Sequence, residues 1–262
     1  MSDSVETQVP AVPALEARGL GLSWDDGAHM VAEDIDLHVS AGEVVCLVGR
    51  SGCGKTTILH ALAGLTQPVT GRVLLNGADV TGVPGRVSYM LQKDLLLRNL
   101  RIVDNASLPL VLSGVPREEA RARANELFAQ FGLEGTQELW PSQLSGGMKQ
   151  RAAFLRTYLM GNDVVLLDEP FSALDAITRQ ELRTWYVRMA AELHVASLVI
   201  THDVDEAVSL ASRVMVLAGR PSEGKPSRLV GEVLVDRAQD AGDFSLTHAY
   251  VDAKREIMTL LG

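Results

Sequence analysis

A glycine-rich segment between a β-like run and a helical run has the residue types that bind phosphate. Residues 49–57 read GRSGCGKTT; they follow the apolar residues 44–48 and precede residues 58–63, which have helical spacing. Glycines let backbone N–H groups turn around an anion, and a helix N-terminus adds unpaired amides and a positive dipole end. Lys55 is placed to reach the β- and γ-phosphates, and Thr56 to bind Mg²⁺. The segment predicts a nucleoside triphosphate site formed by Gly49, Arg50, Ser51, Gly52, Cys53, Gly54, Lys55, Thr56 and Thr57.

A second candidate group is a pair of acids after a short apolar run. Residues 164–167 read VVLL and are followed by Asp168 and Glu169. Such a run is typical of a strand buried on both faces, as in a parallel sheet. Asp168 would hold Mg²⁺ directly or through water, and Glu169 would orient a water for in-line attack on the γ-phosphate. The alternative is that Glu169 only caps the following turn.

A third segment predicts another helix N-terminus that suits an anion. Ser145 is a natural N-cap, and Gly146 and Gly147 follow it at the start of an apolar helix that includes residues 152–159. Bare glycine amides allow close approach of a phosphate. Two such helix starts do not easily serve one nucleotide within one monomer. The pattern therefore implies a second copy of the chain.

Together these segments resemble the nucleotide-binding subunits of ATP-binding cassette (ABC) transporters. LSGGMKQR at residues 144–151 is similar to the family's signature motif. The resemblance implies ATP and Mg²⁺ as ligands. It also implies an α/β P-loop NTPase fold with a RecA-like parallel-sheet core, an antiparallel β subdomain and an inserted α-helical subdomain. We expect a disordered segment over residues 1–13 and the ABC ATPase domain over 14–262, with the helical subdomain at about 93–160.

Further site residues are expected from the same resemblance. Gln92 is similar to the Q-loop glutamine that senses Mg²⁺ and the γ-phosphate, and it joins Thr56 and Asp168 as an expected metal-binding residue. Ser172–Asp175 resembles the D-loop, which crosses the dimer seam in this family. His202 matches the switch histidine, so Glu169, His202 and Gln92 are the expected catalytic residues. Trp24 is at the position of the aromatic that stacks on adenine, although a core role stays open.

Local patterns support this organisation. The first residues are polar and contain two prolines, without the basic start and apolar stretch of a signal peptide. Turn signals at residues 25–27 and 76–77 separate short strands. Residues 117–131 predict an amphipathic helix that opens after Pro116. Strand and helix patterns alternate again from Gly161 onward.

Composition restricts the classes of partner. The formal net charge is -9 and there is no Lys/Arg block, which argues against nucleic acid or anionic lipid as the main partner. No apolar run approaches the length of a membrane span. Any membrane attachment is therefore expected to come from a partner subunit. The two cysteines suggest a reducing cytosol, and Cys53 is either an oxidant-sensitive thiol or an inert one.

The resemblance extends to one group of importers. Residues 89–97 and 168–179, together with the closing segment 253–261, are similar to importer subunits for nitrate, sulfonate and taurine, whose relatives serve thiamine-pyrimidine precursors. Arg98 and Asn99 stand where that group usually has Pro-Trp, so the solute stays open. The group implies integral permease subunits, a solute-binding protein indirectly, and dimerisation with itself or a paralogous ATPase. It also implies a peripheral position at the cytoplasmic face of the membrane. Because the sequence ends at Gly262, we expect no regulatory domain of the kind found on the longer sugar-importer subunits.

Two interpretations compete for the leucine run that follows Gln92. Leu95, Leu96 and Leu97 are either core residues or a patch that docks the membrane subunit, because water does not favour three exposed leucines. An alternative function is that of a soluble ABC ATPase outside transport, such as the iron–sulfur assembly scaffold. A small-molecule P-loop kinase would lack the LSGG helix.

Overall fold

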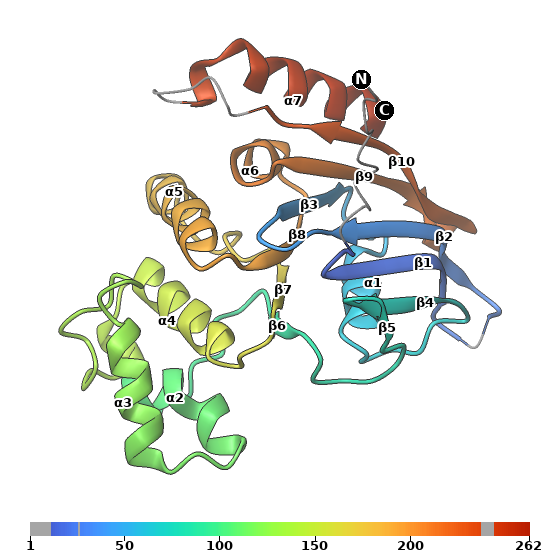
Figure 1. Cartoon of the computed structure of the whole chain (residues 1–262). Coiled ribbons are helices and arrows are strands. Elements are labelled where there is room, and N and C mark those ends of the chain that lie inside the picture. The colour runs from blue at the N-terminus through green and yellow to red at the C-terminus, as the bar shows by residue number, and fades with distance from the viewer. Residues whose placement is uncertain (1–11, 26, 237–243) are drawn as a thin grey trace, which may run out of the picture.

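A mixed ten-stranded sheet runs through the molecule (Figure 1). This is a computed structural model that describes residues 12–25, 27–236 and 244–262. Most of the segment expected to be disordered, residues 1–13, lies outside the described residues. The strands are β1 (Leu15–Ser23), β2 (Met30–Val39), β3 (Val44–Gly49), β4 (Thr70–Leu75), β5 (Ala78–Asp79), β6 (Ser88–Met90), β7 (Val164–Asp168), β8 (Ala196–Thr201), β9 (Arg213–Arg220) and β10 (Lys225–Leu234). Their order is β5-β4-β1-β2-β10-β9-β3-β8-β7-β6.

The parallel part of the sheet runs from β9 to β6. β3 pairs in parallel with both β9 and β8, and β7 pairs in parallel with both β8 and β6. Every residue of β7 and β8 is buried, which confirms that the apolar run before Asp168 is a strand covered on both faces. Since the carboxyl ends of parallel strands share one edge, the loops after β3, β6, β7 and β8 lie at the same edge of the sheet.

The antiparallel part contains β1, β2, β4 and β5. β1 pairs with β2 on one side and with β4 on the other. β4 and β5 form a hairpin whose turn residues Asn76 and Gly77 have φ values of 48° and 81°. Positive φ at both central residues is the requirement of a type I′ turn, which confirms the turn predicted there. The predicted fold class, a parallel core with an antiparallel β subdomain and inserted helices, is therefore confirmed.

The helices cover the sheet and form a separate lobe. They are α1 (Lys55–Leu62), α2 (Ile102–Leu112), α3 (Arg117–Leu127), α4 (Gly146–Tyr158), α5 (Ala176–Glu192), α6 (Val204–Leu210) and α7 (His248–Leu261), with 3₁₀ turns η1 (Pro141–Gln143), η2 (Pro221–Glu223) and η3 (Phe244–Leu246). In Figure 1, α2, α3 and α4 form a lobe inserted between β6 and β7, and α7 lies over β9 and β10. Within the described ranges, no helix is both long and apolar enough to span a bilayer.

The helical lobe differs in detail from the sequence prediction. Residues 93–101 are not helical, and the first helix of the lobe starts at Ile102. The helix predicted for residues 117–131 ends at Leu127. Phe131 turns into the core, where it is fully buried, and Gly132 leaves the helical region with φ 64°. The Phe131 amide still donates to the Leu127 carbonyl at 3.0 Å, so the chain leaves the helical path at Gly132, where a positive φ favours glycine.

Candidate functional site

The glycine-rich segment forms a loop between β3 and α1. Gly54 has φ +93°, and a Cβ placed on it would lie 2.6 Å from Cγ1 of Val31, so this position requires glycine. Lys55 is buried, and its Nζ donates hydrogen bonds to the carbonyls of Gly49 at 2.8 Å and Arg50 at 3.1 Å. The ammonium therefore lies within the curve of the loop, and α1 begins directly after that loop. Both features suit a bound phosphate.

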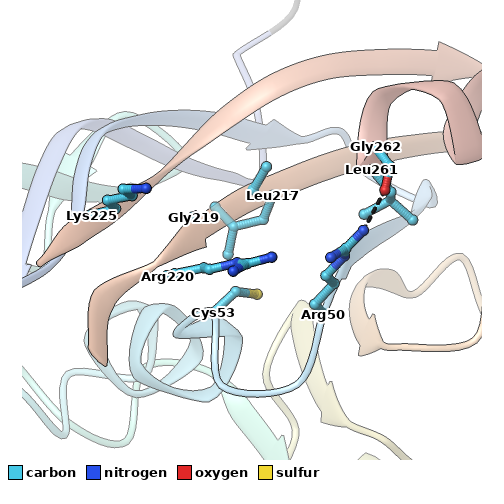
Figure 2. Close-up of a pocket in the computed structure, with 9 residues that line it drawn as sticks. Arg50, Cys53, Leu217, Gly219, Arg220, Lys225, Leu261 and Gly262 are labelled. Atoms are coloured by element: carbon cyan, nitrogen blue, oxygen red, sulfur yellow. Dashed lines mark hydrogen bonds between the residues drawn. The ribbon is translucent and has the colours of Figure 1, made fainter. Parts of the chain in front are cut away.

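Figure 2 shows the side of this loop that faces the end of β9, where Cys53 lies. A pocket of about 340 Å³ is lined there by Cys53, Arg50, Leu217 and Gly262, and an Arg50 Nη2 group donates to the Gly262 carbonyl. Burial raises the pKa of the Cys53 thiol, and the charge of Lys55 opposes this effect. A buried thiol that keeps its proton is a poor nucleophile. The structure therefore favours the inert interpretation of Cys53.

Asp168 ends β7 at the carboxyl edge of the sheet and is 8% exposed. Burial raises the pKa of this carboxyl group, whereas hydrogen bonds with Tyr89 and Thr56 lower it. The Tyr89 hydroxyl donates to Asp168 Oδ2 at 3.3 Å. Carboxylate and hydroxyl oxygens are ligands that Mg²⁺ prefers, so Asp168 and Thr56 together fit the metal that accompanies a nucleoside triphosphate.

Glu169 follows directly and is connected to the loops after β6 and β8. Its Oε1 lies 3.0 Å from His202 Nδ1, and Gln92 Nε2 donates to its Oε2 at 3.4 Å. Gln92 also donates to Ser172 Oγ at 3.3 Å. The Glu169 carboxylate thus contacts the other two predicted catalytic side chains, which argues against a role confined to capping the turn. Glu169 also has φ +45°, a costly conformation for a non-glycine residue that is often found at functional sites.

The second helix start that the sequence predicts to bind an anion belongs to α4. Ser145 is its N-cap, as predicted, and its side chain accepts a hydrogen bond from Met148 N at 3.3 Å. A Cβ on Gly147 would lie 2.8 Å from Cγ2 of Thr178, so glycine lets this helix start pack closely against α5. In Figure 1, α4 lies in the helical lobe, whereas α1 lies beyond β6 and β7. Ser145, Gly146 and Gly147 are therefore not brought to the phosphate loop of their own chain.

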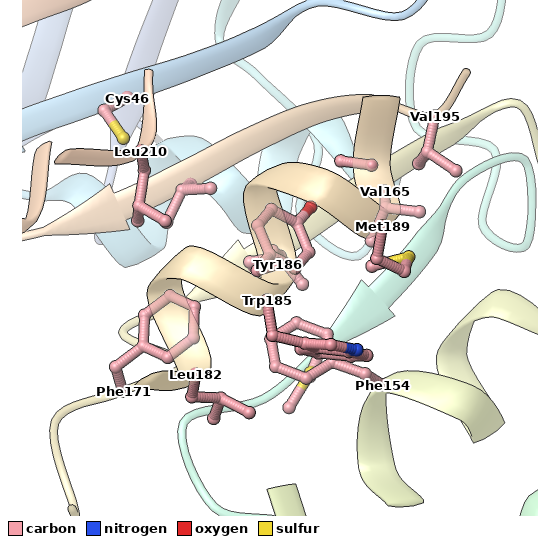
Figure 3. Packing of buried hydrophobic residues seen from close by; sticks show 14 of the residues in the cluster. Cys46, Phe154, Val165, Phe171, Leu182, Trp185, Tyr186, Met189, Val195 and Leu210 are labelled. Carbon is pink, nitrogen blue, oxygen red and sulfur yellow. The ribbon is translucent and has the colours of Figure 1, made fainter. Parts of the chain in front are cut away.

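An aromatic cluster fixes α4 relative to the segment that carries Glu169 (Figure 3). The ring of Phe154, on α4, lies 5.1 Å from that of Tyr186 and 5.6 Å from that of Trp185, both on α5. It also lies 5.8 Å from the ring of Phe171, which follows the acidic pair. Aromatic pairs at these separations add to the stabilisation from burial. The helix α4 and the loop that carries Glu169 consequently belong to one packed unit.

The structure also shows where Trp24 and Asp175, two further predicted site residues, lie. Trp24 directly follows β1 and is 58% exposed, so the core interpretation of this residue is wrong and its ring remains available for stacking. Asp175, in the predicted D-loop, is the N-cap of α5 and accepts a hydrogen bond from Thr178 N at 3.1 Å. The D-loop therefore leads directly into the helix that packs against Gly147.

Sequence reasoning missed one side chain of this site. The sequence assigns no role to Tyr89, which lies within residues 89–97, yet its hydroxyl reaches the metal-binding candidate Asp168. The available signal was positional, since a tyrosine on the strand before Gln92 lies beside the strand that ends in Asp168.

Comparisons with known proteins agree with this arrangement. A family model described as "ABC transporter" matches residues 32–172. The chain is 40% identical over 194 residues to the sulfate/thiosulfate import ATP-binding protein CysA of Mycobacterium tuberculosis, covering 73% of this chain and 55% of that protein. It is 43% identical over 196 residues to the aliphatic sulfonates import ATP-binding protein SsuB 1 of Xanthomonas axonopodis pv. citri, covering 74% of this chain and 78% of that protein. The chain thus spans about half the length of the CysA protein.

Solved structures share the fold. The chain aligns with cbiO1 of Clostridium perfringens, part of the ABC transporter complex cbiONQ, with a TM-score of 0.74 and 24% identity, covering 84% of this chain and 88% of that one. It aligns with the dimeric post-hydrolysis structure of the ATP-binding cassette MJ0796 bound to ADP and Pi, with a TM-score of 0.65 and 26% identity, covering 77% of this chain and 93% of that one. With its phosphate loop, acidic pair and signature helix, this chain belongs to the ABC transporter family as an ATP-binding domain.

Proposed function

We propose that this chain is the ATP-hydrolysing subunit of an importer for a small sulfate- or sulfonate-like anion. The names of the relatives CysA and SsuB 1 support the class of solute, and the sequence resemblance adds nitrate and taurine to it. The observation that carries the proposal is that the Glu169 side chain contacts both His202 and Gln92. These contacts lie at the edge of the sheet where Asp168 ends β7. These side chains come from three separate loops.

Each residue of this site has a chemical task. Lys55 and the amides at the start of α1 would bind the phosphates, with the adenine stacked on Trp24. Thr56 and Asp168 would hold Mg²⁺, which neutralises charge on the phosphate oxygens. Glu169 would accept a hydrogen bond from the attacking water and turn it toward the γ-phosphate.

His202 and Gln92 would keep the Glu169 carboxylate in its orientation. Both contact it from neighbouring loops, at 3.0 Å and 3.4 Å respectively. Positioning of this kind matters because a catalytic group works only when it is held near its productive geometry. The three residues therefore act as one unit in the proposed hydrolysis step.

A second cassette would complete each nucleotide site. Ser145, Gly146 and Gly147 lie in the helical lobe, away from the phosphate loop of their own chain. In a two-fold dimer, the signature helix start of one copy would cover the nucleotide held by the other, and the reverse. Charge-assisted hydrogen bonds to the γ-phosphate would favour the closed dimer, and hydrolysis would release it. The partner is a second copy of this chain or a paralogous ATPase.

An apolar groove beside the site supports docking of a membrane subunit. The groove, defined by its lining residues Leu91, Leu95, Leu97, Leu112 and Met160 among others, has a volume of about 570 Å³. These five side chains are 41–79% exposed. Clustered exposed apolar residues mark interaction surfaces. We assign this docking groove to a cytoplasmic segment of the permease, which would hold the ATPase at the inner face of the membrane.

The three consecutive leucines, residues 95–97, do not share one role: one belongs to the core and two line the docking groove. Leu96 is 7% exposed and belongs to the main core, whereas Leu95 and Leu97 are 51% and 43% exposed and line the docking groove. Asn105 fixes this segment, since its Oδ1 accepts from Leu97 N at 2.7 Å and its Nδ2 donates to the Leu97 carbonyl at 3.1 Å. The groove wall is therefore anchored to α2.

Membrane fractionation of cells that express the tagged chain tests this proposal. The ATPase should sediment with membranes and co-purify with an integral permease and a solute-binding protein, and the latter should bind sulfate, sulfonates, nitrate or taurine. Deletion of the permease should release the chain from membranes. A chain that stays in the soluble fraction and co-purifies with iron–sulfur assembly proteins would contradict the transport function and support the alternative.

A further inference from the structure

Tyr89 lies on β6, the edge strand of the sheet, close to the Asp168 carboxylate. β6 pairs in parallel with β7, and Tyr89 is opposite Leu166 in that pairing. The Tyr89 hydroxyl donates to Asp168 Oδ2 at 3.3 Å. Its ring packs edge-on against His60 of α1, with ring centroids 5.8 Å apart. Tyr89 therefore contacts both the strand that carries Asp168 and the helix that carries Thr56.

Tyr89 is also one of the residues that line the docking groove. Tyr89 is half-buried and shares the groove wall with Met90 and Leu91, which follow it in the chain. A phenol ring is a rigid group with few rotatable bonds. Since β6 carries both Tyr89 and Met90 of the groove wall, a displacement of this strand would carry the rigid ring with it and change the distance between the Tyr89 hydroxyl and Asp168.

The segment that carries Tyr89 touches both carboxylates that follow β7. Tyr89 contacts Asp168, and Gln92, at the end of the same segment, contacts Glu169 at 3.4 Å. One short piece of chain thus joins the docking groove to the metal-binding candidate and to the proposed base. The contact of Tyr89 with Asp168 is made by its hydroxyl group alone. Replacing Tyr89 with phenylalanine therefore removes this contact and keeps the ring.

We propose that Tyr89 is a positioning residue for Asp168, whose hydroxyl orients this carboxylate for the metal and links its position to occupancy of the docking groove. The inference rests on the proposed metal-binding role of Asp168. The 3.3 Å separation exceeds the usual range of about 2.5–3.0 Å for an O–H···O hydrogen bond, so a small shift of β6 would strengthen the contact.

The first test is the Mg²⁺ requirement of Tyr89→Phe in the intact chain. At fixed ATP, the Mg²⁺ concentration that gives half-maximal ATPase activity should rise about 2- to 12-fold, the range set by loss of one hydrogen bond. ATP binding measured in EDTA should be unchanged, because the phosphate loop is intact. Tyr186→Phe is the matched control, since it removes a buried hydroxyl that donates to Ser197 Oγ at 2.7 Å. An unchanged Mg²⁺ requirement in Tyr89→Phe, or an equal rise in Tyr186→Phe, would overturn the inference.

A second variant separates failure of the inference from failure of the proposed site. Asp168→Asn should abolish most Mg²⁺-dependent turnover if Asp168 holds the metal. Turnover near wild type in this variant would overturn the metal site and the inference together. Loss in Asp168→Asn, combined with an unchanged Mg²⁺ requirement in Tyr89→Phe, would overturn only the role of Tyr89.

The link to the groove is tested in the membrane-bound complex. The ratio of ATPase activity with and without the co-purified permease should be smaller for Tyr89→Phe than for wild type at saturating Mg²⁺. Attachment to the permease should be retained, because the groove keeps its apolar wall. An equal ratio for Tyr89→Phe and wild type would overturn the proposal that Tyr89 links occupancy of the docking groove to the position of Asp168.

Discussion

His202 Nδ1 lies 3.0 Å from Glu169 Oε1, which joins the loop after β8 to the loop after β7. The backbone reinforces this contact, because Glu169 N donates to the Ile200 carbonyl at 3.0 Å. The side-chain pair is therefore built on two strands that are already held side by side. A change in the position of either loop would alter the direction of the Glu169 carboxylate.

Glu169→Gln should keep ATP binding and lose turnover. The amide cannot act as a base, so we expect ATPase activity to fall by about 10²- to 10⁴-fold, the usual contribution of a positioned acid–base group. The variant should accumulate as an ATP-bound dimer in size-exclusion chromatography. Glu118→Gln, an exposed position on α3, is the matched control. Lys55→Ala should differ from both by losing nucleotide affinity. Near-normal turnover in Glu169→Gln would remove this residue from the proposed role.

Mixing two inactive chains should restore activity if the nucleotide sites are shared. Lys55→Ala disables one phosphate loop and Gly147→Asp one signature helix start, where the new carboxylate would repel the γ-phosphate. A heterodimer of these chains retains one intact composite site, so an equimolar mixture should recover about a quarter of the wild-type sites. ATPase activity of the mixture measures this recovery.

The close contact at Gly147 requires a steric control for the mixing experiment. Any side chain there would meet Cγ2 of Thr178, at 2.8 Å for a Cβ. Gly147→Ala reports the cost of that contact without a charge, and size-exclusion chromatography shows whether the mixed chains dimerise. Absence of recovery among dimers that demonstrably form would contradict the shared site.

Adjacent leucines should respond in opposite ways to the same substitution. Leu97→Glu places a carboxylate on an exposed groove wall, so it should weaken membrane association and leave the melting temperature nearly unchanged. Leu96→Glu buries an unpaired carboxylate in the core, which costs several kcal/mol and should lower the melting temperature by about 5 °C or more. Thermal unfolding and membrane sedimentation of both variants test this. A large loss of stability in Leu97→Glu would mean that this leucine is also core.

Glu206 should make stability fall as the pH rises from acidic to neutral. Burial raises the pKa of this α6 carboxyl group from 4.5 to about 7. The charge of Asp203 also raises this pKa, whereas the guanidinium groups of Arg183 and Arg179 lower it. Between these two pH values the folded chain retains a proton that the unfolded chain has lost. The contribution of Glu206 to stability is therefore fully present below about pH 4.5 and lost above about pH 7, a difference on the order of 3 kcal/mol.

Glu206→Gln isolates this contribution because it keeps the shape of the side chain without its titration. Urea unfolding of wild type and variant at pH 5 and pH 8 should show that the variant gains stability relative to wild type at the higher pH. An exposed substitution such as Glu118→Gln should show no such pH-dependent difference. Parallel pH profiles for wild type and Glu206→Gln would contradict the assignment.

The sequence by itself was sufficient for the parts of the site that are contiguous in the chain. The phosphate loop at residues 49–57, the acidic pair after residue 167 and the helix start at Ser145 are each defined by residue type, local spacing and the adjacent strand or helix. These features depend on backbone conformation and capping, which neighbouring residues control. The same local logic predicted the Asn76–Gly77 hairpin turn.

Only the tertiary structure decided which distant residues meet and which side chains are buried. It separated Leu96 from Leu95 and Leu97, enclosed Cys53, exposed Trp24 and placed the Tyr89 hydroxyl on Asp168. Each of these outcomes depends on packing between strands and helices far apart in the sequence, because burial and side-chain contacts are properties of the assembled sheet edge and its covering helices. The sequence does not distinguish three consecutive leucines from one another. Only the leucine whose side chain faces the core can be buried in it.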